Sequence, residues 1–397
     1  MTPMRICFLS RRFFPAISGM SVYALNLVRE LVDAGHDVTM ISQYRGDAAG
    51  TAIYGGGPPP DVPGARVIGL EAHGEQDGGA FERDVETMRR TVVEAGPFDL
   101  VHAQYGYPTG LAGLLAAADL GVPGVVSIQG GDGHWVGSCC ATHERAMRAV
   151  LDGADALLIG SRSFAEEVHE RLGTPVERFT IVPGAVDTAR FAPNGGPPPD
   201  APFRLLYHGR ADRRKGLLDF LEAVERLDRP AEAVVSGIGP DLDAARTRAR
   251  GLPVRFTGRA DYDDAPERYR SADAFVSPTY AEGFSNTILE AMASGLPIVS
   301  CRAVGVVDCL RDRDNALLVE PGDVEALTDA LRQVVDDAAL RTRLAATALE
   351  EARSVYSWKT VGQQIMDVYA SVRAAGRFVA PDPAIEPCRF RAAPHLL

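Results

Sequence analysis

Residues 6–41 read ICFLSRRFFPAISGMSVYALNLVRELVDAGHDVTMI, and their pattern indicates a β-α-β unit. The apolar run at 6–9 is typical of a short buried strand, and apolar residues then recur at helical spacing from Val22 to Val32. Gly35 ends the helix, and residues 38–41 form the next strand. Strands joined in this way lie parallel with a right-handed crossover, so we expect a parallel sheet covered by helices.

The same alternation runs through the chain in two blocks. In the first block, further strands are expected at 100–101, 125–128, 156–159 and 179–182, with helices at 111–118, 144–150 and 163–172. In the second, strands are expected at 204–208, 232–236, 254–257, 274–277 and 298–301, with helices at 217–227, 242–250, 286–293 and 324–337. We therefore predict an α/β protein of two doubly wound, Rossmann-like domains that face each other across a cleft, with ligands at the carboxyl ends of the strands.

A segment rich in glycine and proline sets the predicted domain boundary. The run GGPPP at 195–199 cannot continue a helix or a central strand. We take 191–203 as a linker between a first domain at 1–190 and a second at 204–360. A helix at 361–376 and an irregular tail at 377–397 are expected to follow.

Composition excludes several classes of function. The 397 residues include 41 Lys and Arg against 53 Asp and Glu, a net charge of −12, which argues against nucleic acid and anionic membranes as partners. No apolar run reaches the roughly 20 residues of a membrane span, and no secretory signal is recognisable, so we expect no integral membrane association. The six cysteines form no CxxC pair or zinc spacing, which favours a reduced, cytoplasmic setting without a metal site.

The segment AEGFSNTILEAMASGLP at 281–297 carries the most chemistry. Ser285 or Asn286 is a natural N-cap, which leaves Glu282 in the loop before the helix and Glu290 inside it. The two carboxylates can then reach different parts of one extended ligand. The N–H groups of Ser285, Asn286 and Thr287 would suit a phosphate. The alternative is a capped helix with one surface glutamate and one half-buried glutamate.

A basic turn, HGRADRRKG at 208–216, follows a strand and opens a helix. Gly209 allows close approach of the backbone, Arg210 can fork onto a phosphate and Lys215 adds a compact charge. Two such cations could stabilise a diphosphate leaving group. The alternative is a solvated basic turn of the kind that charge runs usually form.

Two loops of the first domain complete the candidate residues. The loop PAISGMS at 15–21 could face phosphates with its backbone, but it is not the GxGxxG of a dinucleotide site. The segment IQGGDGHW at 128–135 offers polar contacts near a reacting centre, or else a turn in which Asp132 caps backbone groups. The residues that we expect to contact an acceptor are Ser18, Gln104, Tyr105, Gln129, Asp132 and His134.

Together these clusters resemble the family-4 retaining glycosyltransferases of the GT-B fold, from about residue 4 to residue 370. The most specific part is 282–293, which matches that family's Glu-x7-Glu motif, and Gly209-Arg210 with Lys215-Gly216 matches its phosphate-binding turn. The run Tyr356-Ser357-Trp358 is similar to the family's approach to a last helix that returns to the N-terminal domain.

The resemblance implies retaining, metal-independent transfer of a sugar from a nucleoside-diphosphate sugar, with a UDP-sugar favoured, and no resident cofactor. It implies that Arg210 and Lys215 hold the β-phosphate, that Glu282 orients donor-sugar hydroxyls and that Glu290 binds the ribose. The other implied donor contacts are the backbone of Gly19 and of Phe284, Ser285, Asn286 and Thr287 at the diphosphate, the backbone near Arg259 at the base, and Gly209 and Gly237 giving room.

The chain departs from the family pattern at two positions. Gln129-Gly130 stands where the family often has His-Gly, and Ser18-Gly19 stands where Gly-Gly is usual. These departures keep open a sugar-nucleotide-binding auxiliary subunit without turnover. A UDP-sugar epimerase or a phosphorylase of the same architecture is a further alternative. The expected acceptor is a small soluble molecule or a glycan, with a lipid-linked glycan intermediate as the second choice.

Overall fold

The chain forms two compact units in a computed structural model that describes residues 2–46, 55–73, 81–131, 137, 140–193, 202–374 and 378. The first unit comprises residues 1–183 together with 361–397, and the second comprises residues 184–360. The first unit is therefore built from both ends of the chain. Of the expected tail at 377–397, all but Phe378 lies outside the described residues.

The boundary between the units differs from the one that the sequence suggested. The division falls after Pro183 rather than after residue 190, because the segment that follows packs into the second unit. Val186 and Phe191 are buried in a core of that unit, and the N–H of Val186 donates to the carbonyl of Tyr356 at 2.8 Å. Residues 194–201 of the expected linker lie outside the described residues.

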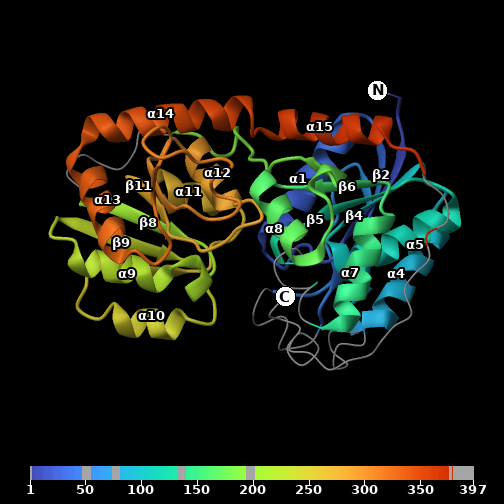
Figure 1. Cartoon of the computed structure of the whole chain (residues 1–397), viewed down its shortest axis with the longest axis horizontal. Coiled ribbons are helices and arrows are strands. Elements are labelled where there is room, and N and C mark those ends of the chain that lie inside the picture. Colours follow the sequence, from blue (N-terminus) through green and yellow to red (C-terminus); the bar gives the residue numbers. More distant parts are fainter. Residues whose placement is uncertain are drawn as a thin grey trace. The chain divides into compact units, whose positions relative to one another are not determined.

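The first unit has an all-parallel, seven-stranded sheet, which confirms the doubly wound class expected for it (Figure 1). Its strand order is β3-β2-β1-β4-β5-β6-β7, so the order reverses between β1 and β4. The strands are β1 (Arg5–Ser10), β2 (Asp37–Tyr44), β3 (Ala65–Glu71), β4 (Leu100–Gln104), β5 (Gly124–Ile128), β6 (Ala156–Ile159) and β7 (Phe179–Ile181).

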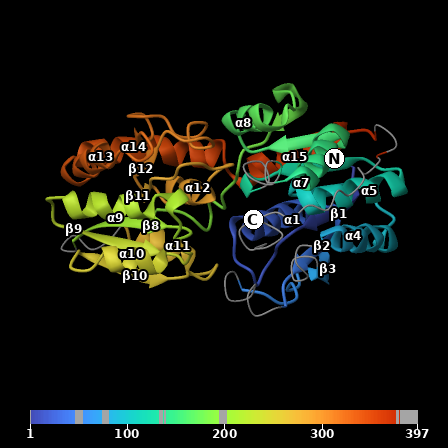
Figure 2. The same ribbon diagram turned by 60° about the horizontal axis from the view of Figure 1, so that its bottom comes forward.

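Helices cover both faces of this sheet. They are α1 (Gly19–Asp33), α4 (Phe81–Ala95), α5 (Leu111–Leu120), α7 (Ala141–Gly153), α8 (Arg162–Leu172) and α15 (Trp358–Ser371), with short helical turns at η1 (Gly106–Gly110) and η3 (Val176–Arg178). The helices α4, α5 and α7 lie together on one side, and α1 and α15 lie on the other (Figures 1 and 2).

The last helix is tied to the centre of the first unit by a buried histidine. The Nδ1 atom of His102, on β4, lies 2.5 Å from the hydroxyl of Tyr369 on α15, and its Nε2 atom lies 2.7 Å from Ser127 Oγ on β5. Burial lowers the pKa of His102 to about 3, so the ring is neutral and can donate through one nitrogen while accepting through the other. Gly362 packs against the side chain of Glu30 on α1. These contacts explain why residues after 360 belong to the first unit.

The second unit has an all-parallel, six-stranded sheet in the order β10-β9-β8-β11-β12-β13. The strands are β8 (Phe203–His208), β9 (Ala231–Ser236), β10 (Val254–Gly258), β11 (Ala274–Ser277), β12 (Ile298–Cys301) and β13 (Leu317–Val319). The order reverses between β8 and β11. Ligands of doubly wound sheets bind beyond the carboxyl ends of the strands at such a switch point.

Two layers of core cover the faces of this second sheet. Because successive strand residues point to opposite faces, Leu205 and Tyr207 join one core while Leu206 joins the other. The helices are α9 (Leu217–Arg226), α10 (Leu242–Arg248), α11 (Ala265–Arg270), α12 (Asn286–Ala293), α13 (Val324–Asp336) and α14 (Ala338–Ser354), with a short turn η4 (Arg213–Lys215). In Figure 1, α9 and α10 lie on one side of the sheet, and α11 and α12 lie on the other.

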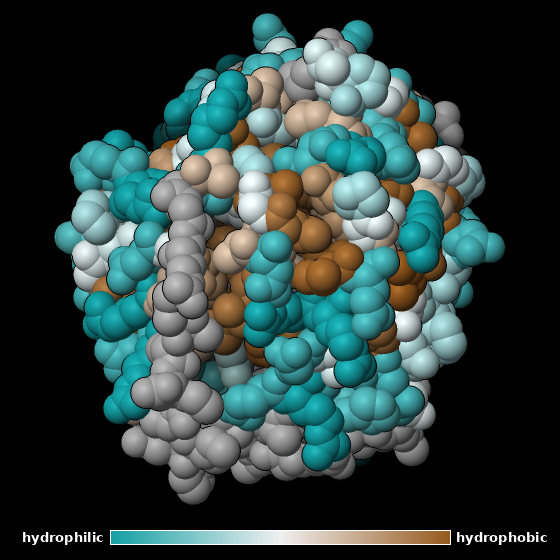
Figure 3. All heavy atoms as spheres, turned by 90° about the vertical axis from the view of Figure 1, so that its right-hand side faces the viewer, coloured by the Kyte–Doolittle hydropathy of each residue, from teal (hydrophilic) through white to brown (hydrophobic). Residues whose placement is uncertain are grey.

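Most predicted elements occur within a few residues of their expected bounds, and β6, β11, α12 and β12 have the expected ones. Of the strands and α-helices in the described part of the chain, five were not expected: β3, α4, α11, β13 and α14. Among the residues described, no helix is both long and apolar enough to cross a membrane. The face of the first unit seen in Figure 3 is mainly hydrophilic, with hydrophobic residues gathered near its centre.

Candidate functional site

The carboxyl ends of β8, β9 and β10 are held together by their backbones. The N–H of Gly209 donates to the carbonyl of Ser236 at 3.0 Å, and that of Gly237 donates to Gly258 at 2.8 Å. Gly237 has a φ of +147°, and a Cβ atom there would lie 1.8 Å from the carbonyl oxygen of Gly209. Only glycine fits at position 237, so this residue lets the loops after β8 and β9 approach each other closely at the end of the sheet.

The basic turn after β8 is organised around a buried aspartate. Asp212 accepts hydrogen bonds from the N–H and the guanidinium of Arg214 at 2.9 and 2.8 Å, and it lies 3.6 Å from Nε of Arg210. Burial favours its neutral form, but the bonds from Arg214 and the charge of Arg210 bring the pKa of Asp212 below its usual value. The hydroxyl of Tyr207 donates to the carbonyl of Arg210 at 2.7 Å. The turn thus holds its cations in a fixed frame.

Two of the charged residues singled out in the sequence form a direct ion pair. Lys215 Nζ lies 2.7 Å from Glu282 Oε1 and 3.5 Å from the carbonyl of Ala281. The N–H of Glu282 donates to Val304 at 2.9 Å, which fixes the loop from the other side. Lys215 follows β8 and Glu282 follows β11, so the pair stands at the switch point of the sheet.

The start of α12 lies next to this pair in the chain. Ser285 occupies the N-cap position, and its carbonyl accepts the N–H of Leu289 at 3.3 Å. Its hydroxyl lies 3.2 Å from that of Thr287 instead of capping the helix. The Phe284 ring packs 5.7 Å from the ring of Tyr356. The backbone from 284 to 287 therefore leads into a helix N-terminus, which favours anions.

Glu290 lies one turn further into α12 and is half-buried. The hydroxyl of Tyr269, on α11, donates to its Oε2 atom at 2.7 Å. Burial raises the pKa of Glu290 to about 7, although the bond from Tyr269 and the charge of Arg190 act in the opposite direction. Glu290 is therefore protonated more readily than an ordinary glutamate. Arg259, the residue expected near the base, follows β10 directly and is exposed.

In the first unit, the candidate loop after β1 is closed by a helix cap. Ser18 is the N-cap of α1, and its side chain accepts the N–H of Ser21 at 3.2 Å. Gly19 is the first residue of the helix. The sequence suggested Ser18 as an acceptor contact, and the structure gives its side chain a local role in starting α1.

Replacing Ser18 with alanine is expected to cost about 1 kcal/mol of stability, because one N–H group at the start of α1 loses its partner. Glycine at the same position is expected to cost only a few tenths of a kcal/mol, because glycine is itself a favourable N-cap residue. Urea unfolding of the two variants measures the difference. Equal stability of the alanine variant and the natural protein would contradict the capping role.

Gln104 and Tyr105 are placed differently from what was expected for acceptor contacts. Gln104 is fully buried, accepts from Ser10 Oγ at 3.0 Å and donates to the carbonyl of Met20 at 3.2 Å. Tyr105 is also buried, with the Arg11 guanidinium 5.0 Å from its ring centre. Both side chains therefore support the loops at the ends of β1 and β4 instead of being presented at the surface.

The remaining residues predicted for the first unit follow β5. Gln129 is half-buried directly after that strand, while Asp132 and His134 lie outside the described residues. Within the described part of the chain, no group of three or more His, Cys, Asp or Glu residues is placed to hold a metal ion.

Tyr269 is the residue of this site that sequence reasoning missed. It lies in the six-residue helix α11, which begins near Pro266 and was not expected. The only signal was an aromatic residue among charged ones just before the strand at 274–277. Nothing in that pattern points to Glu290, which is brought to it by the packing of α11 on α12.

Two family models match the chain. The model described as "Glycosyl transferases group 1" matches residues 202–337, and the model described as "Glycosyl transferase 4-like domain" matches residues 18–185. A protein from Mycobacterium tuberculosis named glycogen synthase is 27% identical, with 95% of this chain and 97% of that protein covered. A D-inositol 3-phosphate glycosyltransferase from a Nocardioides species is 29% identical, with 90% and 86% covered.

Solved structures share the architecture. A sucrose-phosphate synthase from Thermosynechococcus elongatus superposes with a TM-score of 0.79 at 22% identity, over 92% of this chain and 98% of that one. The Anabaena protein HepE, solved in complex with UDP and glucose, gives 0.75 at 16% identity, over 93% of this chain and 100% of that one. At this level of identity the likeness shows the fold.

Proposed function

Since the chain belongs to the group 1 glycosyl transferases and has the GT-B fold, it is a glycosyltransferase, and we propose that it uses a UDP-sugar and retains the anomeric configuration. The observation that carries this proposal is the pairing of Lys215 with Glu282 at the switch point. Arg210 belongs to the same turn as Lys215, and Glu282 comes four residues before the first residue of α12. These groups supply positive charge for a diphosphate and a carboxylate for sugar hydroxyls in one place.

The donor base is proposed from three considerations. A Cβ atom at Gly209 or at Gly258, the residue before Arg259, would meet no atom within 4 Å, so the backbone at these two glycines is open to the approach of a flat base. Glu290 offers a carboxylate to the two hydroxyls of a ribose. Among proteins of similar fold, HepE was solved with UDP and glucose and an Escherichia coli protein was solved with UDP-2-fluoro glucose. Uridine diphosphate is therefore the first donor class to test.

The proposed reaction breaks the bond between the anomeric carbon and the β-phosphate oxygen. Lys215 and Arg210 stabilise the negative charge that grows on the leaving diphosphate. The acceptor hydroxyl attacks from the same face, and the departing phosphate oxygen takes its proton. Glu282 holds Lys215 in position through their ion pair. Glu282 lies in the loop just before α12, and we propose that its carboxylate also accepts hydrogen bonds from donor-sugar hydroxyls. In this proposal the two cations provide the charge, and no metal or resident cofactor is required.

The proposed acceptor is a hydroxyl of a small soluble molecule or a glycan. The relatives named above include a glycogen synthase and a D-inositol 3-phosphate glycosyltransferase, one name pointing to a glycan and the other to a small polyol. The net charge of −12 argues against nucleic acid as a partner. Gln129, half-buried after β5, is the first-unit side chain that we propose for acceptor contact.

The test is a thermal-shift screen with UDP-, GDP-, ADP- and dTDP-sugars, each with and without EDTA, followed by product analysis. Stabilisation by a UDP-sugar that EDTA leaves unchanged is expected, because a ligand that binds the folded state raises its melting temperature. Slow release of free sugar and UDP should follow. With an acceptor, NMR of the product should show the donor's anomeric configuration.

Other outcomes point to the alternatives. Nucleotide binding without turnover on any acceptor would favour an auxiliary subunit, and release of an altered UDP-sugar without an acceptor would favour an epimerase. A requirement for orthophosphate would favour a phosphorylase. Inversion at the anomeric carbon would contradict the same-face mechanism while leaving glycosyl transfer in place.

UDP affinity is expected to rise with pH through about 7, because burial raises the pKa of Glu290 to that value and the charged carboxylate is the better acceptor for ribose hydroxyls. Below the pKa, binding must first remove a proton, so affinity should fall by up to about tenfold per pH unit. Calorimetry from pH 5.5 to 8.5 measures this dependence.

Glu290→Gln separates this effect from the ionisation of UDP itself. The terminal phosphate of UDP, with a second pKa of about 6, titrates whichever protein binds it, but only the natural protein has the Glu290 carboxylate. The variant should show a raised donor KM, a nearly unchanged kcat and no step at pH 7. A step that persists in the variant would assign the pH dependence to another group.

A further inference from the structure

We propose that Tyr269 is a positioning residue for the transfer reaction, which holds the Glu290 carboxylate in the orientation that receives the donor ribose. This inference rests on the proposed function, because it takes a nucleotide ribose as the partner of Glu290. It goes further by assigning a role to a residue that touches no substrate.

The position of the Tyr269 ring is fixed by its surroundings. Tyr269 is fully buried, and its ring centre lies 5.5 Å from that of His208, 5.6 Å from that of Phe191 and 5.7 Å from that of Phe275. These partners come from β8, from the segment after β7 and from β11. A ring held on several sides cannot swing its hydroxyl away, so the position of its hydroxyl oxygen is set by packing.

The hydroxyl points at the carboxylate of Glu290. It lies 2.7 Å from Glu290 Oε2 and 3.3 Å from the carbonyl of Thr287, so the short bond goes to the carboxylate. A carboxylate has about four lone-pair sites on its two oxygens, and one bond from Tyr269 leaves capacity for two ribose hydroxyls. Tyr269 is buried while Glu290 is half-buried, so the residue that accepts the bond is nearer the surface than the one that donates it.

The charge of Glu290 depends on the same bond. The groups that act on its ionisation are the hydroxyl of Tyr269, from α11, and the guanidinium of Arg190, from the segment after β7. Both favour the charged form against burial, which raises the pKa of Glu290 to about 7. Removing the Tyr269 hydroxyl would therefore leave the carboxylate less well oriented and more often protonated at neutral pH.

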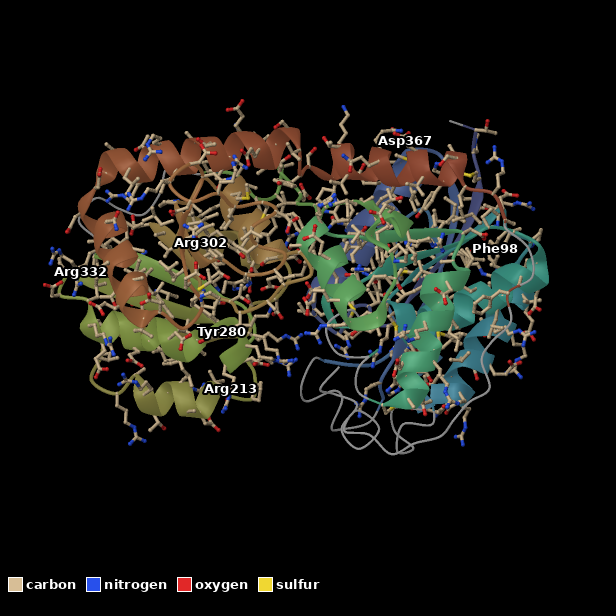
Figure 4. The ribbon with its side chains drawn as sticks, in the orientation of Figure 1. Phe98, Arg213, Tyr280, Arg302, Arg332 and Asp367 are labelled. Atoms are coloured by element: carbon tan, nitrogen blue, oxygen red, sulfur yellow. The ribbon has the colours of Figure 1, made fainter. Side chains whose placement is uncertain are left out.

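The chain contains a matched control for this bond. Tyr280 donates to a carboxylate, that of Asp219 on α9, at the same distance of 2.7 Å. Tyr280 is an exposed residue of the same unit, labelled in Figure 4, and Asp219 is not among the residues proposed to bind the donor. Tyr280→Phe thus removes the same chemical bond without touching the proposed ribose contact.

The experiment compares the affinities of UDP, 2′-deoxy-UDP and 3′-deoxy-UDP by calorimetry at pH 7.5. The natural protein is expected to prefer UDP over the deoxy compounds by about tenfold, the value of one good hydrogen bond to a charged group. Tyr269→Phe should lower the affinity for UDP by about fivefold to tenfold and change the affinities for the deoxy compounds little. Most of the preference for UDP would then disappear. Tyr280→Phe should leave the affinities for all three compounds, and therefore the preference for UDP, unchanged.

A double-mutant cycle tests whether Tyr269 acts through Glu290. In the Glu290→Gln background, Tyr269→Phe is expected to change UDP affinity by less than about twofold, because the group that it positions has been altered. Replacement of Tyr269 by 3-fluorotyrosine, which keeps the ring and makes the hydroxyl a stronger donor, should shift the pH midpoint of UDP binding downward. The phenylalanine variant should shift it upward. The fluorinated protein keeps the test valid even if the phenylalanine variant folds poorly.

The outcomes separate the two levels of the proposal. A natural protein that binds UDP with a ribose preference, together with a Tyr269→Phe variant that keeps this preference and the pH midpoint, would overturn the positioning role alone. A natural protein that binds no nucleotide would overturn the proposed function and this inference with it. If Tyr269→Phe lowered the affinities for UDP and for both deoxy compounds equally, Tyr269 would have a structural role only.

Discussion

Replacing Lys215 with alanine is expected to lower kcat by at least about tenfold, a loss of more than about 1.4 kcal/mol of transition-state stabilisation. The leaving diphosphate would lose the compact cation that stands beside it in the proposed site. Glu282, 2.7 Å away in the ion pair, would at the same time lose its partner and present an uncompensated negative charge to the phosphate. Initial rates with a saturating UDP-sugar and an identified acceptor measure the effect.

Two further variants make this result specific. Lys215→Arg keeps the charge and should recover part of the activity, limited by the different shape of the guanidinium. Arg213→Ala removes a cation from the same turn. The side chain of Arg213, labelled in Figure 4, is 76% exposed and pairs with Asp241 at 3.4 Å. Exposed ion pairs contribute little energy, so kcat should stay within about twofold. Turnover of Lys215→Ala close to that of the natural protein would remove Lys215 from the chemistry.

Replacing Gly237 with alanine is expected to destabilise the second unit by more than about 2 kcal/mol, which lowers its melting temperature by roughly 5–10 °C. The new Cβ atom would lie 1.8 Å from the carbonyl oxygen of Gly209, and the φ of +147° disfavours any side chain. The loops after β8 and β9 would have to separate, so UDP affinity should fall as well. Calorimetric melting with and without UDP measures both effects.

Gly251→Ala is the matched control for this substitution. Gly251 also has a positive φ, of +82°, but a Cβ atom there meets no atom within 4 Å. Its cost should be limited to about 1 kcal/mol of backbone strain, with UDP affinity unchanged. Equal melting temperatures for the two variants would show that the close approach of the two loops does not matter for stability.

The elements that the sequence predicted well are those with a continuous apolar signal and a clear end. The helix α12 was predicted at its observed bounds because Ser285 precedes it and Gly295 and Pro297 follow it. The helix α4 was missed although Val85, Met88 and Val92 are buried at helical spacing, because charged residues separate them. The strand β13 has only three residues, too few for a periodic pattern.

The sequence allowed us to predict which residues form the candidate site, but not which of their side chains contact one another. Lys215 and Glu282 could be assigned to one site because both follow strands of one sheet. Their direct pairing depends on side-chain packing between distant segments, as does the bond from Tyr269 to Glu290. Gln104 was predicted as an acceptor contact and its side chain is buried, because the end of a strand can turn a side chain inward as readily as outward.

The return of α15 to the first unit has a consequence for how the protein is made. The chain leaves the ribosome at about 5–20 residues per second, so the second unit separates the two parts of the first by roughly 10–35 s. During that interval, His102 lacks the hydroxyl of Tyr369, and the helix that covers α1 does not yet exist. The first unit, although synthesised first, is therefore the last to be completed. A nascent chain interrupted before α15 carries an incomplete first unit followed by a complete second unit.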